Sequence, residues 1–392
     1  MGPDMRRHSA HIAGLFAGIG GLELGFSEAG GYTELLCERD ADAQNVLQAR
    51  FQSTALHGDV QGLRSLPAGI DTILAGFPCQ DLSQAGRTRG IQGCRSSLVS
   101  EVFRLARSRL VRNVVLENVP FMLRLDQGRA MEYVTAELEA LGFRWAYRVL
   151  DSQGFGVAQR RRRVFVIASR DRNVARQLFP EDVHSEAPKA PKAFGFYWTE
   201  GNTGLGWAED AVPALKCGSG LGIPSPPAIW FPKRGVFTPS IEDAEALQGF
   251  PRGWTESLEH SGGGRRRWRL IGNAVTVPVA RWVAERLLSR EAELPVGIAL
   301  RAGDPWPGAA YGGPRQLAMR VVCSEQPIAV RLALGEMVEP SNRLSERATR
   351  GFYQRLSKSG LRRPAAFDTA LVRHIEKMAQ LRSAQEVRAP GG

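Results

Sequence analysis

The sequence predicts an α/β fold with a doubly wound, mainly parallel sheet, joined to a smaller irregular domain and a C-terminal helical extension. Strand-like and helix-like segments alternate between residues 10 and 170, as expected for parallel strands joined by helical crossovers. Residues 171–237 are instead rich in Pro, Gly, Trp and Ser and show little helical periodicity. Helical periodicity then returns. We therefore expect a core (1–170), a smaller domain (171–237), a return to the core (238–289) and an extension (290–392).

Short apolar runs mark the strands, and longer amphipathic runs mark the helices. Strands are expected at Ala10–Phe16, Thr33–Cys37, Ala55–His57, Asp71–Ala75, Asn113–Leu116, Arg144–Leu150 and Val164–Ala168. Helices are expected at Leu22–Ala29, Ala41–Phe51, Ser97–Leu110, Ala130–Leu141, Ile241–Leu247, Val277–Leu288, Leu344–Leu356 and Ala366–Leu381, with a glycine- and arginine-rich loop at Gly262–Arg269. Ligands of such sheets bind at the carboxyl ends of the strands, so the residues after each strand should share one edge.

The charge balance favours a polyanionic partner such as nucleic acid. Lys and Arg number 51 against 40 Asp and Glu, a formal net charge of +11. The five cysteines, at positions 37, 79, 94, 217 and 323, lack the spacing of a metal site or a thioredoxin-like motif, which indicates reduced thiols in a cytoplasm and no metal site. We expect no signal peptide and no membrane span.

A glycine-rich turn follows the first strand. Phe16–Gly21 would let a ligand approach the backbone closely, and Glu38, at the end of the next strand, could accept hydrogen bonds from ribose hydroxyls. The turn is not Gly-x-Gly-x-x-Gly, which argues against a nicotinamide oxidoreductase. A tight strand–helix turn without a ligand is the alternative.

Cys79 stands in Gly76-Phe77-Pro78-Cys79-Gln80, directly after a buried strand. Pro78 stiffens this turn and would present the thiol at the carboxyl end of the sheet. A lone cysteine is usually a small buried hydrophobe, but a thiol on such a loop beside a ligand site is more typical of a nucleophile.

Charged residues follow two later strands. A carboxylate buried at Glu117 would have a raised pKa and could hold or donate a proton, although a helix cap would also explain it. Arg160–Arg163 follows Gln159, and alternate residues of a strand share a face, so Gln159, Arg161 and Arg163 should point the same way. A solvated arginine face is the alternative.

Together these blocks make the chain resemble the DNA (cytosine-5) methyltransferases over about residues 10–288. The blocks that carry the resemblance occur in the family's order: Phe16–Gly21, Glu38, Asp59, Gly76–Gln80 with Ser83, Glu117–Val119, Gln159–Arg163, Thr238–Pro251 and Gly272–Pro278. The resemblance implies a Rossmann-like methyltransferase core with 171–237 as its target-recognition domain. It also implies methyl transfer from S-adenosylmethionine to C5 of a cytosine that is flipped out of duplex DNA.

The resemblance assigns roles to individual residues. Cys79 would attack C6, Glu117 would protonate or hydrogen-bond N3, and Arg161, with Arg163, would hold the base carbonyl. S-adenosylmethionine would contact Phe16, Gly18, Ile19, Gly21, Glu38, Arg39, Asp59, Val60, Pro78, Leu98, Asn273, Ala274 and Val275. Arg39 stands where the family often has an aromatic or apolar side chain, and an arginine can stack on adenine too.

DNA contacts are implied for Gln80, Ser83, Gln159, Lys216, Lys233 and Arg234, with Ser219, Ser225 and Trp230 as further recognition candidates. Ala214 replaces the Thr that the family often has before Leu215. Segment 290–392 carries a net charge of +6 and would either touch DNA or only extend the packing.

The resemblance suggests a monomeric bacterial enzyme of the cytoplasm, either paired with a restriction endonuclease or acting alone. A tRNA methyltransferase on the same fold and a non-catalytic DNA-binding regulator are the competing hypotheses. Both the nucleophile and the glycine loop are present, which argues against the regulator.

Overall fold

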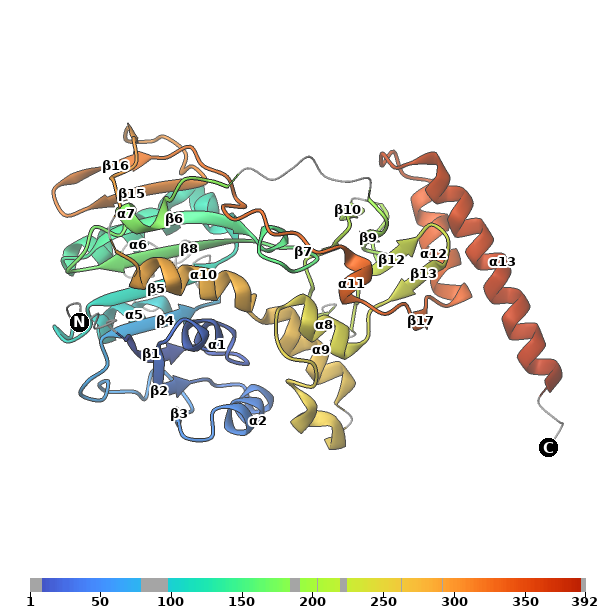
Figure 1. Ribbon diagram of the computed structural model, residues 1–392, viewed down its shortest axis with the longest axis horizontal. Helices are drawn as coiled ribbons and strands as arrows, with labels where there is room; N and C mark the ends of the chain where they lie inside the picture. Colours follow the sequence, from blue (N-terminus) through green and yellow to red (C-terminus); the bar gives the residue numbers. More distant parts are fainter. Residues whose placement is uncertain are drawn as a thin grey trace, which may run out of the picture.

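A computed structural model describes residues 9–78, 98–183, 191–202, 204–218, 224–261, 263–290 and 292–388. Its centre is a ten-stranded sheet with the order β14-β16-β15-β6-β8-β5-β4-β1-β2-β3 (Figure 1). The strands are β1 (His11–Leu15), β2 (Tyr32–Cys37), β3 (Ala55–His57), β4 (Thr72–Gly76), β5 (Asn113–Asn118), β6 (Arg144–Asp151), β8 (Arg162–Ser169), β14 (Ile298–Ala299), β15 (Ala309–Gly313) and β16 (Gln316–Arg320).

One half of this sheet is parallel and the other half is antiparallel. β3, β2, β1, β4 and β5 run parallel, so their carboxyl ends meet at one edge. From β5 outwards, β8, β6, β15, β16 and β14 pair antiparallel. The last three of these strands come from the C-terminal segment. This segment therefore adds strands to the ten-stranded sheet and is not only helical.

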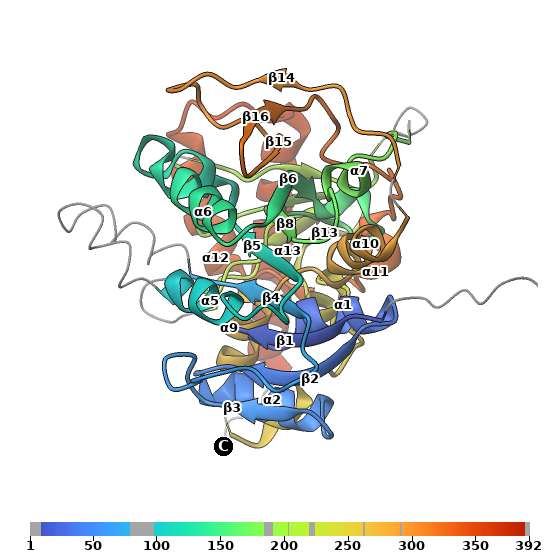
Figure 2. The ribbon, with the colours of Figure 1, turned by 90° about the vertical axis from the view of Figure 1, so that its left-hand side faces the viewer.

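Helices cover both faces of the sheet, as the doubly wound class requires (Figure 2). One face packs against α5 (Leu98–Ala106) and α6 (Arg129–Ala140). The other packs against α1 (Gly21–Glu28), α7 (Ala175–Leu178) and α10 (Val277–Leu288). Gly25 lets α1 and α10 touch, because a Cβ there would lie 2.6 Å from the Ala280 Cβ. α2 (Ala41–Arg50) follows β2.

The irregular region forms a second sheet, with the order β10-β9-β12-β13-β17. Its strands are β9 (Phe194–Phe196), β10 (Ala208–Glu209), β12 (Ala228–Phe231), β13 (Gly235–Thr238) and β17 (Asn342–Arg343), and a two-stranded sheet pairs β7 (Gln159–Arg160) with β11 (Val212–Pro213). α12 (Glu346–Ser357) and α13 (Ala365–Arg388) cover the outer face of the five-stranded sheet, where Phe196, Phe352 and Phe367 are fully buried. The C-terminal segment is thus shared between both sheets (Figure 1).

α8 (Ile241–Leu247) and α9 (Gly264–Asn273) lie between the two sheets, with the short α11 (Leu334–Met337) nearby. The loop expected at Gly262–Arg269 is wrong, because α9 begins at Gly264. Arg267 is the reason that this arginine-rich stretch folds inwards: its buried guanidinium donates to Thr255 Oγ1 and pairs with Glu245 and Glu259. Among the described residues, no helix combines the length and the apolarity that crossing a membrane requires.

Glu23, in the first turn of α1, is buried, and no described residue forms an ion pair or a side-chain hydrogen bond with its carboxyl group. A Cβ on Gly14 would lie 2.1 Å from its Oε1, so only glycine leaves room for this carboxyl against β1. The pKa of Glu23 is raised to about 8, mainly by burial and in part by the Glu38 charge, while its own backbone N–H opposes the shift. Glu23 is therefore mostly protonated in the folded protein at neutral pH.

Replacing Glu23 with Gln should flatten the pH dependence of stability. The folded state keeps a proton that the unfolded chain releases above its pKa of 4.5, so the wild-type free energy of unfolding falls as pH rises from there towards 8. At neutral pH this loss is roughly 3 kcal/mol, and the amide cannot ionise. Denaturant unfolding at about pH 5 and about pH 8 measures it. If the free energy of unfolding changed by the same amount between the two pH values in both proteins, Glu23 would not titrate as inferred.

Candidate active site

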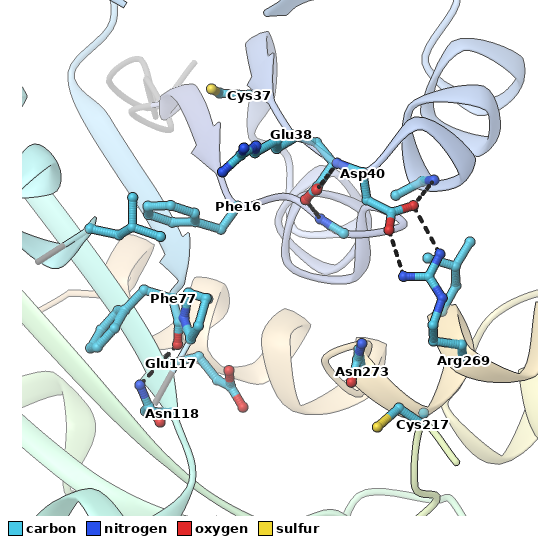
Figure 3. A pocket seen from close by; sticks show the side chains of 18 of the residues that line it. Phe16, Cys37, Glu38, Asp40, Phe77, Glu117, Asn118, Cys217, Arg269 and Asn273 are labelled. Carbon is cyan, nitrogen blue, oxygen red and sulfur yellow. Dashed lines mark hydrogen bonds and ion pairs between the residues drawn. The ribbon is translucent and has the colours of Figure 1, made fainter. Parts of the chain in front are cut away.

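A cavity of about 680 Å³ lies at the carboxyl ends of β1, β2, β4 and β5, and α9 closes its opposite wall (Figure 3). Its volume is in the range of small-molecule sites. Residues from segments more than two hundred positions apart meet here. They include Phe16, Gly18, Glu38, Arg39, Asp59, Val60, Pro78, Leu98, Glu117, Arg161, Arg163 and Asn273, all of them expected site residues.

The glycine turn is fastened to the end of β2. Phe16 and Gly18 both have positive φ, 55° and 56°, which glycine adopts freely and Phe16 does not. The Gly18 N–H donates to Glu38 Oε2 at 2.8 Å, and the Asp40 N–H donates to Glu38 Oε1 at 2.7 Å. Burial raises the pKa of Glu38, and these two hydrogen bonds lower it. Each carboxylate oxygen keeps acceptor capacity towards the cavity.

Arg269 links α9 to the same corner, and the sequence analysis missed it. Its guanidinium donates to Asp40 Oδ2 at 2.5 Å (Figure 3). It also donates to Asp42 Oδ2 at 3.0 Å. Burial would raise the pKa of Asp40, but the hydrogen bonds and charge of Arg269 and the backbone N–H groups of α2 bring it below its usual value. Arg269 shares a helix face with Asn273 four residues later, but this spacing carries a signal only once α9 is known to form where a loop was expected.

The deep end of the cavity holds a carboxylate between two arginines. Arg163 Nε lies 3.0 Å from Glu117 Oε1, and both side chains are largely buried. Burial raises the pKa of Glu117, while the charges of Arg163 and Arg161 oppose the shift. This is an acid whose proton affinity is set by burial and by two neighbouring cations, an environment typical of a group that transfers protons.

Arg161 is held rigidly and still has a free donor. Its Nη1 donates to the Leu215 carbonyl at 3.1 Å and its Nη2 to the Ala274 carbonyl at 2.8 Å. Within the described part of the chain, its buried Nε has no hydrogen-bond partner. Burial, and next the charge of Arg163, lower the pKa of Arg161. An unsatisfied buried donor beside a cavity is suited to a ligand's carbonyl oxygen.

The ends of β4 and β5 are tied to each other at this point. Asn118 Nδ2 donates to the Phe77 carbonyl at 3.0 Å, and Asn118 Oδ1 accepts from the Val119 N–H. The residue before Pro78 is thus fixed relative to Glu117. Cys79, Gln80, Ser83, Cys94 and Ser219 lie outside the described residues.

Four expected cofactor contacts do not line the cavity: Ile19, Gly21, Ala274 and Val275. They support its walls instead. The Ile19 carbonyl accepts from Trp254 Nε1, and the Ala274 carbonyl accepts from Arg161. Gly21 is packed against the chain at Val275, because a Cβ there would lie 2.5 Å from the Val275 carbonyl oxygen.

The structure does not support the expected DNA contact of Gln159. The side chain is fully buried, donates to the Leu247 carbonyl and to Gln248 Oε1, and accepts from the Leu215 N–H. Its polar atoms serve the junction between the two sheets and are not free to meet a ligand. The expectation that Gln159 shares a face with the two arginines is confirmed: Arg160 and Arg162 are exposed between them, and both Gln159 and Arg161 hydrogen-bond the Leu215 backbone.

The other expected DNA contacts lie at the rim or beyond it. Lys216 pairs with Glu200, and its Nζ lies 3.7 Å from the centre of the Tyr197 ring. The next residue, Cys217, is an exposed free thiol that lines the cavity, which the sequence analysis did not anticipate. Lys233 and Arg234 are exposed at the β12–β13 turn, Ser225 hydrogen-bonds Thr199, and Trp230 is buried under α13.

Comparisons with known proteins agree with this geometry. A family model described as C-5 cytosine-specific DNA methylase matches residues 10–200. Type II methyltransferase M2.BsuMI of Bacillus subtilis (strain 168) is 42% identical over 367 residues, which cover 88% of this chain and 93% of that protein. Type II methyltransferase M.DsaV of Dactylococcopsis salina is 28% identical over 320 residues, covering 73% and 88% respectively.

Solved structures support the fold. The crystal structure of S. pombe Dnmt2 methyltransferase aligns with a TM-score of 0.52 at 16% identity, covering 71% of this chain and 98% of that one. At that identity the likeness concerns the fold alone, and it confirms the expected Rossmann-like class. From the extent of the match to M2.BsuMI, the chain belongs to the C-5 cytosine-specific DNA methylase family and is a DNA cytosine-5 methyltransferase.

Proposed function

We propose that this enzyme transfers the methyl group of S-adenosylmethionine to C5 of a cytosine flipped out of duplex DNA, with Cys79 as the nucleophile. One observation carries the proposal: a single cavity is lined at one end by the glycine turn with Glu38 and at the other by Glu117 with Arg161 and Arg163. A cofactor and a base held at these two ends would meet in the middle.

The residues present fit S-adenosylmethionine. Glu38 offers carboxylate acceptors to the ribose hydroxyls, and the open backbone at Gly18 leaves room, since a Cβ there would meet nothing within 4 Å. Asp59 and Arg39 line the same end and would face the adenine, and Asn273 lies opposite on α9. When bound, the cofactor supplies an electrophilic methyl group.

Cytosine C5 is a weak nucleophile, and the chain's own residues would activate it. The Cys79 thiolate forms a bond to C6, and the electron pair of the C5–C6 double bond moves towards C5. Glu117 donates a proton or hydrogen bond to N3, where negative charge would otherwise build up, and Arg161 binds the base carbonyl. C5 then forms a bond to the methyl group, and the electrons of the broken carbon–sulfur bond stay on the sulfur of the departing cofactor. A base removes the C5 proton, the electron pair restores the C5–C6 double bond, the N3 proton returns to Glu117, and Cys79 leaves as the thiolate.

The target base must leave the helix stack to reach this cavity. The net charge of +11 would hold the flanking phosphates, and Lys216, Lys233 and Arg234 are candidates on the recognition side. Both relatives quoted above are named Type II methyltransferases. We infer the same setting here: the modification enzyme of a bacterial restriction-modification system, monomeric and cytoplasmic, with a cognate endonuclease encoded nearby.

Methyl transfer from labelled S-adenosylmethionine to unmethylated duplex DNA and to tRNA, measured in parallel, tests the substrate. We expect label on DNA, recovered as 5-methyl-deoxycytidine after digestion. Label on tRNA alone would keep the mechanism and replace the substrate. If the protein binds DNA but transfers no label to either nucleic acid, it would instead be a non-catalytic DNA-binding regulator.

Replacing Arg269 with Met should weaken cofactor binding more than it slows the chemical step. Without the guanidinium, Asp40 would lose its ion-pair partner beside Glu38, whose position depends on the Asp40 N–H, while Asp42 would keep its ion pair with Arg266. We expect the KM for S-adenosylmethionine to rise by about tenfold while kcat changes little, because the lost interaction is not special to the transition state. Arg269→Lys should recover part of the loss. A fall of kcat by about tenfold with an unchanged KM for S-adenosylmethionine would contradict this role.

A further inference from the structure

The net positive charge of the C-terminal segment lies in residues 345–392, the part that contains its two final helices and the turn between them. Residues 290–344 contain six Lys or Arg and six Asp or Glu, and they supply the strands that extend the catalytic sheet. Residues 345–392 contain ten Lys or Arg against four Asp or Glu. The net charge of +6 of the segment therefore belongs to the part with α12 and α13, which packs on the five-stranded sheet.

These helices bury apolar side chains and leave their basic ones outside. Phe352 of α12 and Phe367 of α13 pack against Phe196, whereas Arg347 and Arg350 are exposed. Packing alone would need only the apolar face. The opposite face of α12 carries arginines at the spacing of neighbours on one side of a helix.

This face borders a groove of about 560 Å³, which we call the α12 groove. Its lining includes Arg347, Arg350, Gln354, Arg355 and the half-buried Trp198. Arg350 also pairs with Glu346 at 2.8 Å, but its side chain is 53% exposed, so the guanidinium remains accessible to a second anion. Guanidinium groups beside an indole and an amide are typical of a nucleic-acid backbone site.

The α12 groove is connected to the active-site cavity through a short series of contacts. Arg355 Nε donates to the Glu200 carbonyl at 2.9 Å, and its Nη2 donates to the Trp198 carbonyl at 3.0 Å. The Glu200 carboxylate in turn pairs with Lys216, directly before the cavity-lining Cys217. Arg355, Glu200 and Lys216 thus form a chain of contacts from the groove to the residue before the cavity-lining Cys217.

We propose that the α12 groove binds backbone phosphates of duplex DNA flanking the target cytosine. This inference rests on the proposed DNA substrate and adds the C-terminal helices to the recognition domain as a second, sequence-independent contact. Arg347 and Arg350 neutralise phosphates, while Arg355 holds α12 against the backbone at Trp198 and Glu200.

The test compares full-length wild type with Arg347→Gln/Arg350→Gln and with a control, Arg301→Gln/Arg320→Gln. The control removes two exposed arginines from the neutral part of the segment. Duplex affinity is measured against salt, and methyl transfer is measured at saturating DNA with the same samples. If the variant Arg347→Gln/Arg350→Gln, the groove variant, loses two phosphate contacts, its slope of log Kd against log salt should fall by about 2, since each contact contributes roughly 0.9. Its kcat should stay at the wild-type value.

Each outcome separates the two proposals. An unchanged slope and Kd in the groove variant, with active wild type, would overturn the α12 contact and leave the methyltransferase proposal intact. An equal loss in the control would show a general charge effect and would also overturn the contact. A wild type that puts no label on DNA would refute the proposed substrate, and the groove inference with it.

Discussion

Cys79→Ala should reduce methyl transfer to the assay background while leaving S-adenosylmethionine binding nearly intact. No other group in the proposed mechanism can add to C6, and C5 of an unactivated cytosine does not attack a methyl group at a useful rate. The proposed cofactor contacts lie on Glu38, Asp59 and the glycine turn instead, all of which line the cavity. Label transfer and calorimetric binding of the cofactor measure the two effects.

Cys217→Ala is the matched control, because Cys217 is an exposed thiol that lines the same cavity. It should retain most of the activity. If Cys217→Ala were inactive and Cys79→Ala active, the nucleophile would be assigned to the wrong cysteine. Loss of cofactor binding in Cys79→Ala would point to a structural thiol.

Glu117→Gln should lower kcat by about 10²- to 10⁴-fold, the contribution typical of a positioned general acid. The amide can still donate a hydrogen bond to N3 but cannot transfer a proton, and it no longer balances Arg163. Single-turnover transfer with saturating DNA and cofactor isolates this step from binding. Glu132→Gln, an exposed position on α6, is the control.

The pH profile supplies a second readout of Glu117. Burial raises the pKa of this acid, so its protonated form persists further towards neutral pH than an exposed glutamate would allow. Wild-type activity should therefore decline as rising pH removes the proton, and Glu117→Gln should lose that limb of the profile. Near-normal turnover in Glu117→Gln would remove the proton-handling role.

The parallel half of the sheet could be predicted because its strands are continuous apolar runs that end in polar residues or glycine. Thr33–Cys37 and Asn113–Leu116 fall within β2 and β5, and Val277–Leu288 coincides with α10. The shared edge followed from the class alone, since parallel strands bring their carboxyl ends together. The helices expected from periodicity at Leu344–Leu356 and Ala366–Leu381 are found as α12 and α13.

The β15–β16 hairpin could not be predicted from local pattern. Ala309–Gly313 contains two glycines and two alanines, and such a run resembles a turn more than a strand. It is a strand because it pairs with β6, more than 150 residues earlier, and Tyr311 then packs against the core. Pairing over that distance leaves no local signature.

Arg269 and Gln159 show the same limit within the site. Arg269 reaches Asp40 across 229 positions, and only the fold brings them together. Gln159 has the residue type of a DNA contact, but its amide was needed to bridge Leu247 and Leu215. Residue type predicted which groups could do the chemistry, and tertiary contacts decided which were free to do it.

The most direct test of the central claim is to trap the covalent intermediate. A duplex that carries 5-fluorocytosine at the target prevents removal of the C5 substituent as a proton, so the enzyme cannot release the base after methyl transfer. With S-adenosylmethionine present, we predict a covalent protein–DNA complex whose modified peptide contains Cys79, and no complex with Cys79→Ala. Attachment at Cys217, or methylation of ordinary DNA without any trapped complex on the fluorinated duplex, would contradict the mechanism.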